Sequence, residues 1–267
     1  MITAIAGRVL GAWVVCALLQ GALWSVSKRT KNAGIVDVGW ALAFSVVATM
    51  FAGGAIAPAA GWLPIALVVM LWSGRLGVYL ISRGAAIGPE EGRYVELRQR
   101  WQPNADSGFF AFFQAQAALT AVLSIAFVAP FIEPAWDGGA LRGLGFVIAM
   151  GGIAGESLAD AQLARWKRDP TNRGRVCDIG LWGYSRHPNY FFEWLVWLGY
   201  AVYSLAFHGG WIALVAQGVI LASIWKVTGI PATENQAIRS KGDAYRDYQK
   251  RVSKFVPLPP KSRGNNT

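Results

Sequence analysis

A short block in the second half of the chain joins polar residues to a very apolar segment. Residues 185–199 read SRHPNYFFEWLVWLG, in which Arg186, His187 and Asn189 stand directly before a tryptophan-rich run that contains Glu193. His187 is one of two histidines in the chain. A carboxylate inside such a run, with donors and acceptors at its beginning, is typical of a site that holds a polar ligand.

Further charged residues lie inside other apolar runs of the chain, where a charge costs roughly 2.5–3.5 kcal/mol. Measured from the cytoplasmic end of each run at about 1.5 Å per residue, these residues lie on the order of 8–13 Å deep in the membrane. Two pairs, Glu156 with Asp160 and Asn189 with Glu193, are four residues apart and share a helix face. These residues predict one polar cavity that opens to the cytoplasm. The charged residues concerned are Asp37, Arg75, Glu156, Asp160 and Glu193.

A structural alternative accounts for some of the same residues. Arg75 could pair with Asp37 or Glu156 between helices, and Asp160 could pair with Arg165. The alternative explains single residues better than all of them together.

The loop before the block supplies positive charge. Arginine binds phosphate through two parallel hydrogen bonds, and Pro188 at the start of a helix leaves N–H groups that favour an anion. Trp182 and Tyr184 could stack on a planar base. An alternative is that the cations face anionic lipid head groups, at about 1 kcal/mol each. The cations of this loop are Arg165, Lys167, Arg168, Arg173, Arg175 and Arg186.

The elements that position these residues are predicted to be membrane helices. Hydrophobic residues make up 54% of the 267 residues, charged residues only 15%, and the mean hydropathy is positive. Such a composition is typical of a polytopic all-α membrane protein. The first apolar run is expected to be a retained helix. Seven runs are long enough to span a bilayer, at about 4–26, 36–57, 60–82, 109–132, 140–161, 189–206 and 209–228.

Charge sets the orientation that we expect. Most of the 25 Lys and Arg residues lie on alternate connections, so the positive-inside rule places the N-terminus outside and the C-terminal tail in the cytoplasm. The net charge of +10 then follows from topology, and no nucleic-acid partner is predicted. Residues 84–107 are expected to form a helix at the membrane interface. Pro231 should break the last span, followed by a polar helix that carries Tyr245 and Tyr248.

Other common sites are not indicated. Cys16 and Cys177 lie in different environments, so no disulfide is predicted, and the two histidines have no cysteine partners that would make a metal site. No glycine-rich dinucleotide or P-loop motif is found, so a nucleotide would be held without those folds.

The block and several other segments together resemble a known family. The segment GLWGYSRHPNYFFEWLVWLGYAV at 180–202 precedes a glutamate, Glu234, with Tyr245 and Tyr248 downstream and then VPLPP. DVGWALAF, RLGVYL, RYVELR and LADAQLARWK fit the same pattern. Over nearly its whole length the chain resembles the steroid 5-alpha-reductase-like integral membrane proteins, in particular their bacterial branch of unknown function. That group includes sterol reductases and is related to the isoprenylcysteine carboxyl methyltransferases.

The resemblance implies a seven-helix enzyme of the bacterial inner membrane that binds NADPH from the cytosol and reduces a carbon–carbon double bond of a lipid. It implies a substrate-side cavity within residues 1–107 and a nucleotide site within residues 108–267 of a single membrane domain. The cofactor-binding residues it implies are Arg93, Tyr94, Asp160, Lys167, Trp182, Arg186, His187, Asn189, Glu234, Tyr245 and Tyr248.

The substrate side departs from the family pattern. In the steroid reductases of this family, a Gln-Glu pair and a tyrosine hold the carbonyl of the substrate, whereas this chain has DVGW and, at the tyrosine position, Trp72. An indole cannot supply a proton as a phenol can. We expect Asp37, Arg75 and Glu193 to be catalytic, with Trp40, Trp72 and Tyr79 near a steroid-like, isoprenoid or other lipid substrate.

Two other functions remain open at this point. Membrane methyltransferases that use S-adenosylmethionine share a related R-H-P-x-Y block and a C-terminal glutamate. The cations at residues 165–186 favour NADPH over S-adenosylmethionine, because the 2′-phosphate of NADPH needs an Arg or Lys partner. The second alternative is a non-catalytic lipid-binding relative, for which Trp72 is the best argument. In each case we expect a monomer in contact with membrane lipids.

Overall fold

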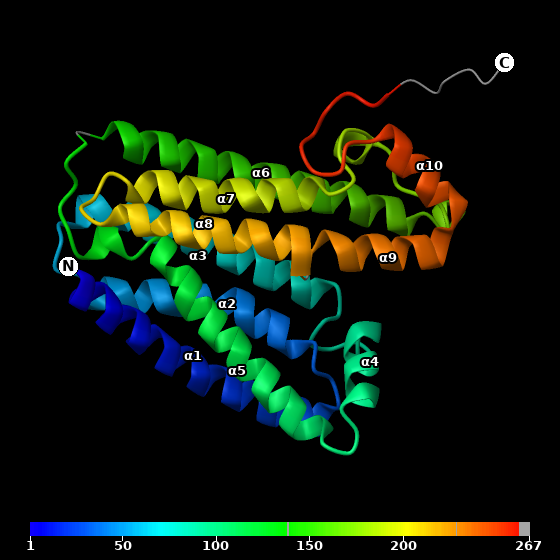
Figure 1. Ribbon diagram of the computed structural model, residues 1–267, viewed down its shortest axis with the longest axis horizontal. Coiled ribbons are helices and arrows are strands. Elements are labelled where there is room, and N and C mark those ends of the chain that lie inside the picture. Colours follow the sequence, from blue (N-terminus) through cyan, green and yellow to red (C-terminus); the bar gives the residue numbers. More distant parts are fainter. Residues whose placement is uncertain (138, 228, 262–267) are drawn as a thin grey trace. The chain divides into compact units, whose positions relative to one another are not determined.

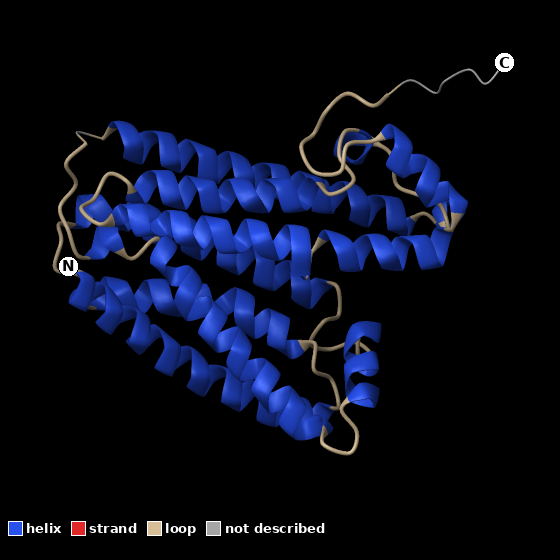
Figure 2. Ribbon diagram, in the orientation of Figure 1, coloured by secondary structure: helices blue, strands red, loops and turns tan. Residues whose placement is uncertain are grey.

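The protein is built of helices and loops (Figure 2). The computed structural model describes residues 1–137, 139–227 and 229–261. Within those ranges no β-strand is formed, which confirms the all-α prediction. The helices are α1 (Ile2–Thr30), α2 (Ile35–Gly53), α3 (Ala59–Ser82), α4 (Gly92–Arg100), α5 (Ala105–Leu123), α6 (Ala140–Arg168), α7 (Pro188–Ser204), α8 (Ala213–Ala222), α9 (Ile230–Lys241) and α10 (Asp243–Arg251), as labelled in Figure 1.

Within the described residues, six segments are long and apolar enough to cross a membrane, so the chain is an integral membrane protein. The sixth span expected from sequence, 189–206, is α7, whose 17 residues extend about 26 Å. The expected seventh span ends at residue 228, outside the described residues. The count of seven and the orientation stay predictions. The six segments are α1, α2, α3, Ala105–Ala126, α6 and Gly210–Lys241.

Prolines and a short polar helix lie where the sequence predicts them. Pro188 is the first residue of α7 and Pro231 lies in the first turn of α9, positions at which a missing N–H costs no helical hydrogen bond. The interfacial helix expected within 84–107 is α4. A π-helical segment, Ser223–Val227, separates α8 from α9.

The chain divides into two compact units. Unit 1 contains Met1–Phe146 and Ala201–Ala216, and unit 2 contains Val147–Tyr200 and Gln217–Thr267. In unit 1, α2 packs against both α1 and α3, and α5 packs along α1 (Figure 1). Its core is rich in edge-to-face aromatic contacts, among them Phe44 with Trp72 at 5.3 Å between ring centroids. The predicted roles of residues 1–107 and 108–267 stay predictions.

In unit 2, two glycines let α6 and α7 approach closely. A Cβ atom on Gly152 would lie 2.7 Å from the backbone nitrogen of Val196, and one on Gly155 would lie 2.2 Å from the ring of Phe192. Small residues of this kind are the usual means by which membrane helices come together. The close packing of α6 on α7 fixes the helix that carries Asn189 and Glu193.

Candidate functional site

The loop that leads into α7 is fixed onto α6. Gly180 has a φ of 54°, in the left-handed region that favours glycine, and the next residue, Leu181, donates its backbone N–H to Oε1 of Gln162 at 2.9 Å. The indole Nε1 of Trp182 donates to the carbonyl oxygen of Ala159 at 2.9 Å. These bonds determine where Arg186 and His187 lie.

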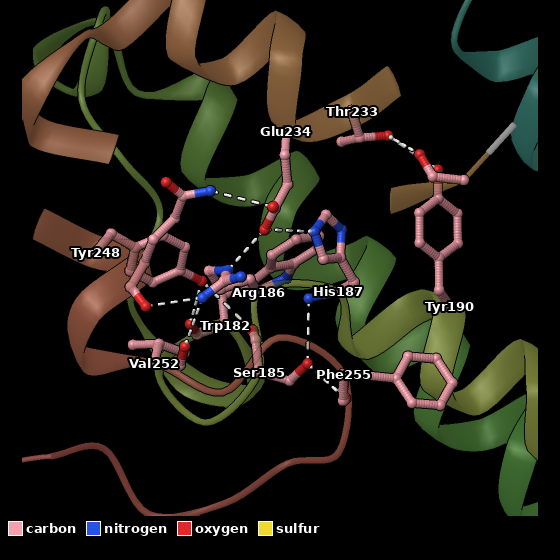
Figure 3. A network of polar contacts seen from close by, with 12 residues as sticks. Trp182, Ser185, Arg186, His187, Tyr190, Thr233, Glu234, Tyr248, Val252 and Phe255 are labelled. Atoms are coloured by element: carbon pink, nitrogen blue, oxygen red, sulfur yellow. Dashed lines mark hydrogen bonds and ion pairs between the residues drawn. The ribbon is translucent and has the colours of Figure 1, made fainter. Parts of the chain in front are cut away.

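Glu234 of α9 is the centre of the polar network drawn in Figure 3. Its Oε1 accepts from Nε of Arg186 at 2.7 Å and lies 3.3 Å from Nε2 of His187. Its Oε2 accepts from Nε2 of Gln249 at 3.0 Å. Only 9% of the Arg186 side chain and 13% of the Glu234 side chain are exposed. Charge-assisted bonds of this kind, shielded from water, are stronger than neutral ones.

Arg186 also holds the end of α10. Its Nη1 donates to the carbonyl oxygens of Gln249 and Val252, at 2.8 and 3.0 Å. Carbonyls at the end of a helix lack intrahelical partners, and a cation there is favourable. The neighbouring Ser185 donates its hydroxyl to the carbonyl oxygen of Phe255 at 2.7 Å. The block at 185–187 therefore fastens the C-terminal segment to unit 2.

The histidine and the two tyrosines around Glu234 are uncharged near neutral pH. Burial lowers the pKa of His187, although the carboxylate of Glu234 opposes that shift. Burial raises the pKa of Tyr245 and of Tyr248, and the charge of Glu234 adds to the shift at Tyr245. The Tyr248 hydroxyl donates to the carbonyl oxygen of Trp182 at 2.5 Å. The site thus contains neutral proton donors around one buried ion pair.

The side of the network toward α7 is more open. The rings of His187 and Tyr190 are stacked, with centroids 5.5 Å apart and planes 13° apart. The Tyr190 hydroxyl lies 3.1 Å from Oγ1 of Thr233 (Figure 3). On the same helix, half-buried Asn189 lies in the first turn of α7. One turn later, Glu193 accepts a hydrogen bond from Nε1 of Trp197 at 2.9 Å.

The other polar residues expected in unit 2 lie on α6. Glu156 and Asp160 are each 5% exposed, so both carboxyl groups are buried one helical turn apart. Lys167 lies in the last turn of the same helix.

A second polar cluster lies in unit 1, at the start of α2. Asp37 accepts from the hydroxyl of Tyr94 at 2.9 Å through one carboxylate oxygen, and its other oxygen is bound by Arg93. The partners of Asp37 thus come from α4, whereas the structural alternative pairs it with Arg75. Arg93 also bonds Glu91 at 3.3 Å. Burial, then the negative charge of Asp37, raises the pKa of Tyr94.

The residues expected near the substrate also lie in unit 1. Trp72 is completely buried and contacts the half-buried Trp40 edge to face, with centroids 6.3 Å apart. The Nε1 of Trp40 is buried and has no hydrogen-bond partner in the described ranges. On α3, Arg75 and Tyr79 are half-buried, and the guanidinium of Arg83 lies 5.5 Å from the ring of Tyr79.

Several residues of these clusters escaped the sequence analysis. Gln249 and Ser185 complete the network in unit 2, and Glu90 pairs with Arg98 at 2.6 Å beside the Asp37 cluster. Burial works against the shift, but the hydrogen bonds from Arg98 and from the Ala33 N–H hold the pKa of Glu90 below its usual range. These partners lie too far apart in the chain for spacing to reveal them.

The fold and these clusters define an all-helical integral membrane protein in which the SRHPNY block is joined to a C-terminal glutamate and two tyrosines. Residues 23–252 match the family described as "Protein of unknown function (DUF1295)", and the chain belongs to that family. An uncharacterized protein of Schizosaccharomyces pombe is 26% identical over 272 residues, which cover 90% of this chain and 77% of the relative. No solved structure matches the chain.

Proposed function

We propose that the protein is an NADPH-dependent reductase of a carbon–carbon double bond in a steroid-like, isoprenoid or other unsaturated lipid. One observation carries the proposal. Residues that the resemblance to steroid 5-alpha-reductase-like proteins assigns to the cofactor meet around Glu234, although up to 66 residues separate them in the chain. They are Trp182, Arg186, His187, Glu234, Tyr245 and Tyr248.

The chemistry of these groups suits a dinucleotide. The carboxylate of Glu234 and the phenols accept or donate hydrogen bonds as ribose and carboxamide groups require, and the stacked His187 and Tyr190 rings offer a flat aromatic surface. Asn189 and Lys167 would add contacts from α7 and α6. When bound, NADPH supplies a hydride to one carbon of the double bond, so the other carbon needs a proton.

Residues of the chain would supply that proton and polarise the substrate. Asp37 would take up a proton from the cytosol and pass it to that carbon, while Tyr94 and Arg93 hold its carboxyl group in one orientation. An indole N–H without a partner costs about 1–3 kcal/mol when it is buried, so the Nε1 of Trp40 suits a site where a substrate oxygen accepts. Arg75 and Glu193 remain our candidates for positioning charge during the reaction.

The setting of the enzyme forms part of the proposal. We place it in a bacterial inner membrane as a monomer with seven spans, α7 included, and with the N-terminus outside. The distribution of Lys and Arg over alternate connections supports this orientation. Cofactor would then reach unit 2 from the cytosol, and the lipid would enter from the membrane.

The test is the thermal stability of detergent-purified protein with NADPH, NADH or S-adenosylmethionine. A ligand at about 100 times its dissociation constant stabilises the fold by about 2.7 kcal/mol. We expect NADPH to raise the melting temperature most, NADH less and S-adenosylmethionine not at all. Asn189→Ala should reduce the NADPH effect, and the matched control Asn235→Ala, at an exposed position of α9, should retain it.

Two results would contradict the proposal. Stabilisation by S-adenosylmethionine alone would identify a methyltransferase. A protein that no dinucleotide stabilises, in the presence of a membrane lipid extract as well as in its absence, would instead be a lipid-binding protein without this chemistry.

A further inference from the structure

A groove in unit 1 lies between the first turns of α1 and the end of α2. Its volume is about 510 Å³, within the range of roughly 300–1,000 Å³ found for small-molecule sites. We call it the α1–α2 groove. It is lined mainly by Gly7, Arg8 and Gly11 of α1 and by Met50, Phe51 and Gly54 at the end of α2. The lining is therefore apolar or small, apart from one arginine.

Two glycines of α1 account for the space in the α1–α2 groove. A Cβ atom on Gly7 would meet nothing within 4 Å, and one on Gly11 would come no closer than 3.8 Å, to the methyl carbon of Met50. Gly152 of α6 is different, because a Cβ there would lie 2.7 Å from the backbone of α7. The glycines of α1 thus do not serve close packing, and they leave room beside α2 for another molecule.

The surface of α1 beside the α1–α2 groove faces lipid. α1 is one of the segments that can cross a membrane, and its side chains Leu10, Trp13 and Val14 are exposed. Water is not available to fill an apolar space in the hydrocarbon region of a bilayer. The occupant of the groove is therefore either a lipid or a second membrane protein.

Arg8 favours a lipid that carries a negative charge. It is the only charged side chain among the first 27 residues, and its Nη2 donates to the carbonyl oxygen of Gly54 at 2.7 Å, at the end of α2. Within the described residues Arg8 forms no ion pair with a carboxylate. A guanidinium has several N–H donors in one plane and binds a phosphate group through two of them. A lipid phosphate would therefore supply the missing counter-charge.

A second copy of the chain is a less suitable occupant. Gly7 and Gly11 have the spacing at which membrane helices often pair. In a symmetric dimer, however, a two-fold axis between these glycines would bring the two Arg8 side chains together, and like charges repel one another. A phospholipid carries the opposite charge and has a flexible chain that adapts to an irregular apolar surface.

We propose that the α1–α2 groove binds one anionic phospholipid, with its phosphate on Arg8 and the first part of an acyl chain beside Gly11 and Met50. Gly11 lies about 4.5 Å further along the helix axis than Arg8, so the chain runs from the arginine toward the middle of α1. The groove is at the opposite end of α1 from Lys28 and Arg29, where the proposed orientation places the outer leaflet.

The experiment counts the lipids bound to the full chain by native mass spectrometry in a neutral detergent. The probes are phosphatidylglycerol and the zwitterionic phosphatidylcholine with the same acyl chains, titrated separately. We expect one phosphatidylglycerol molecule to bind more tightly than further ones, and more tightly than phosphatidylcholine. In Arg8→Gln the affinity of this first site for phosphatidylglycerol should fall by about tenfold and approach that for phosphatidylcholine.

Matched variants locate the site in the α1–α2 groove. Gly7→Leu places a side chain in the groove and should remove the first binding event for both lipids. Gly53→Leu is its control, because a Cβ there also meets nothing within 4 Å but the residue does not line the groove. Arg29→Gln removes an exposed arginine from the other end of α1. Both controls should bind lipid like the wild type.

The proposal is overturned if phosphatidylglycerol binds no more tightly than phosphatidylcholine. It is also overturned if Arg29→Gln weakens the first site as much as Arg8→Gln, since the preference would then come from diffuse charge. A dimer in the same spectra that Gly7→Leu converts to a monomer would assign the groove to a second copy instead. None of these outcomes involves a nicotinamide or the network around Glu234, so they are separate from the fate of the reductase proposal.

Discussion

The guanidinium of Arg186 and the carboxylate of Glu234 form a nearly buried ion pair, with Nε and Oε1 2.7 Å apart, which joins the loop before α7 to α9. Each partner has further bonds, from Gln249 to the carboxylate and from the guanidinium to the end of α10. The pair therefore connects three segments of unit 2, and removal of either charge should affect all of them.

Glu234→Ala should reduce the free energy of unfolding by about 3–5 kcal/mol, because it leaves the guanidinium of Arg186 buried without its counter-charge. Thermal unfolding in detergent measures the effect. The control is Asp247→Ala, which removes an ion pair with Lys250 whose side chains are 66% and 75% exposed. Its cost should be much smaller, because an exposed ion pair is screened by water and contributes little to stability. Equal losses in the two variants would mean that the buried pair has no special role.

Stability should fall in mild acid because of His187. Burial holds its pKa below the ordinary value of about 6.5, so the unfolded chain binds a proton more readily than the folded one. The stability that depends on the neutral imidazole is present above about pH 6.5 and declines as the pH falls below it. Glu234 opposes the shift, whereas Arg186 and Lys254 add to it.

The measurement is the melting temperature between about pH 8 and pH 5. His187→Gln should lose less stability on acidification than the wild type, and His208→Gln, at an exposed position, should follow the wild type. Identical curves for His187→Gln and the wild type would rule out this explanation.

Adjacent glycines of α6 should respond in opposite ways to the same change. Gly152→Ala would place a Cβ 2.7 Å from the backbone nitrogen of Val196 and should destabilise unit 2 by about 1–3 kcal/mol. Gly151→Ala meets nothing within 4 Å and should be neutral or stabilising, by up to about 1 kcal/mol. Melting curves of the two variants test the close packing of α6 on α7. A stable Gly152→Ala protein would show that the helices lie further apart.

The hydrogen bond between Tyr94 and Asp37 should stabilise unit 1. Tyr94→Phe removes the hydroxyl but keeps the ring, which is 1% exposed, and should cost about 1.5–3 kcal/mol because the acceptor is charged. Tyr184→Phe, at a side chain that is 49% exposed, should change stability by about 0.5 kcal/mol or less. If the two variants unfold alike, Asp37 is held by Arg93 alone.

Much of the fold could be predicted from the sequence because membrane helices are local features. Apolar length predicted the six segments that can span a membrane in the described residues, Pro188 predicted the beginning of α7, and the polar helix expected to carry Tyr245 and Tyr248 is α10. The cost of leaving backbone groups unpaired in lipid makes a helix the necessary form of a long apolar run. For α7, which has 17 residues, length alone does not decide whether the helix spans the membrane.

The partners of the polar residues could not be predicted in the same way. Asp37 and Arg93 are 56 residues apart, and Arg186 and Glu234 are 48 apart. Which cation reaches which carboxylate depends on tertiary packing, so the sequence offered Arg75 as a partner of Asp37, whereas the structure pairs Asp37 with Arg93. Likewise, the loop cations looked like one group in sequence, whereas the structure encloses Arg186 in an ion pair and places Arg173 and Arg175 at a separate pocket beside the end of α6.

The central claim is hydride transfer from NADPH to a lipid double bond. The most direct measurement uses NADPH that carries deuterium at the transferred position, prepared as both stereoisomers, with purified protein and a lipid extract from the native membrane. Mass spectrometry then follows the lipids. The account predicts a reduced lipid that carries deuterium from one of the two stereoisomers, and much less of it with Asn189→Ala than with Asn235→Ala. Lipids that stay unlabelled while the same protein methylates them from S-adenosylmethionine would contradict the account.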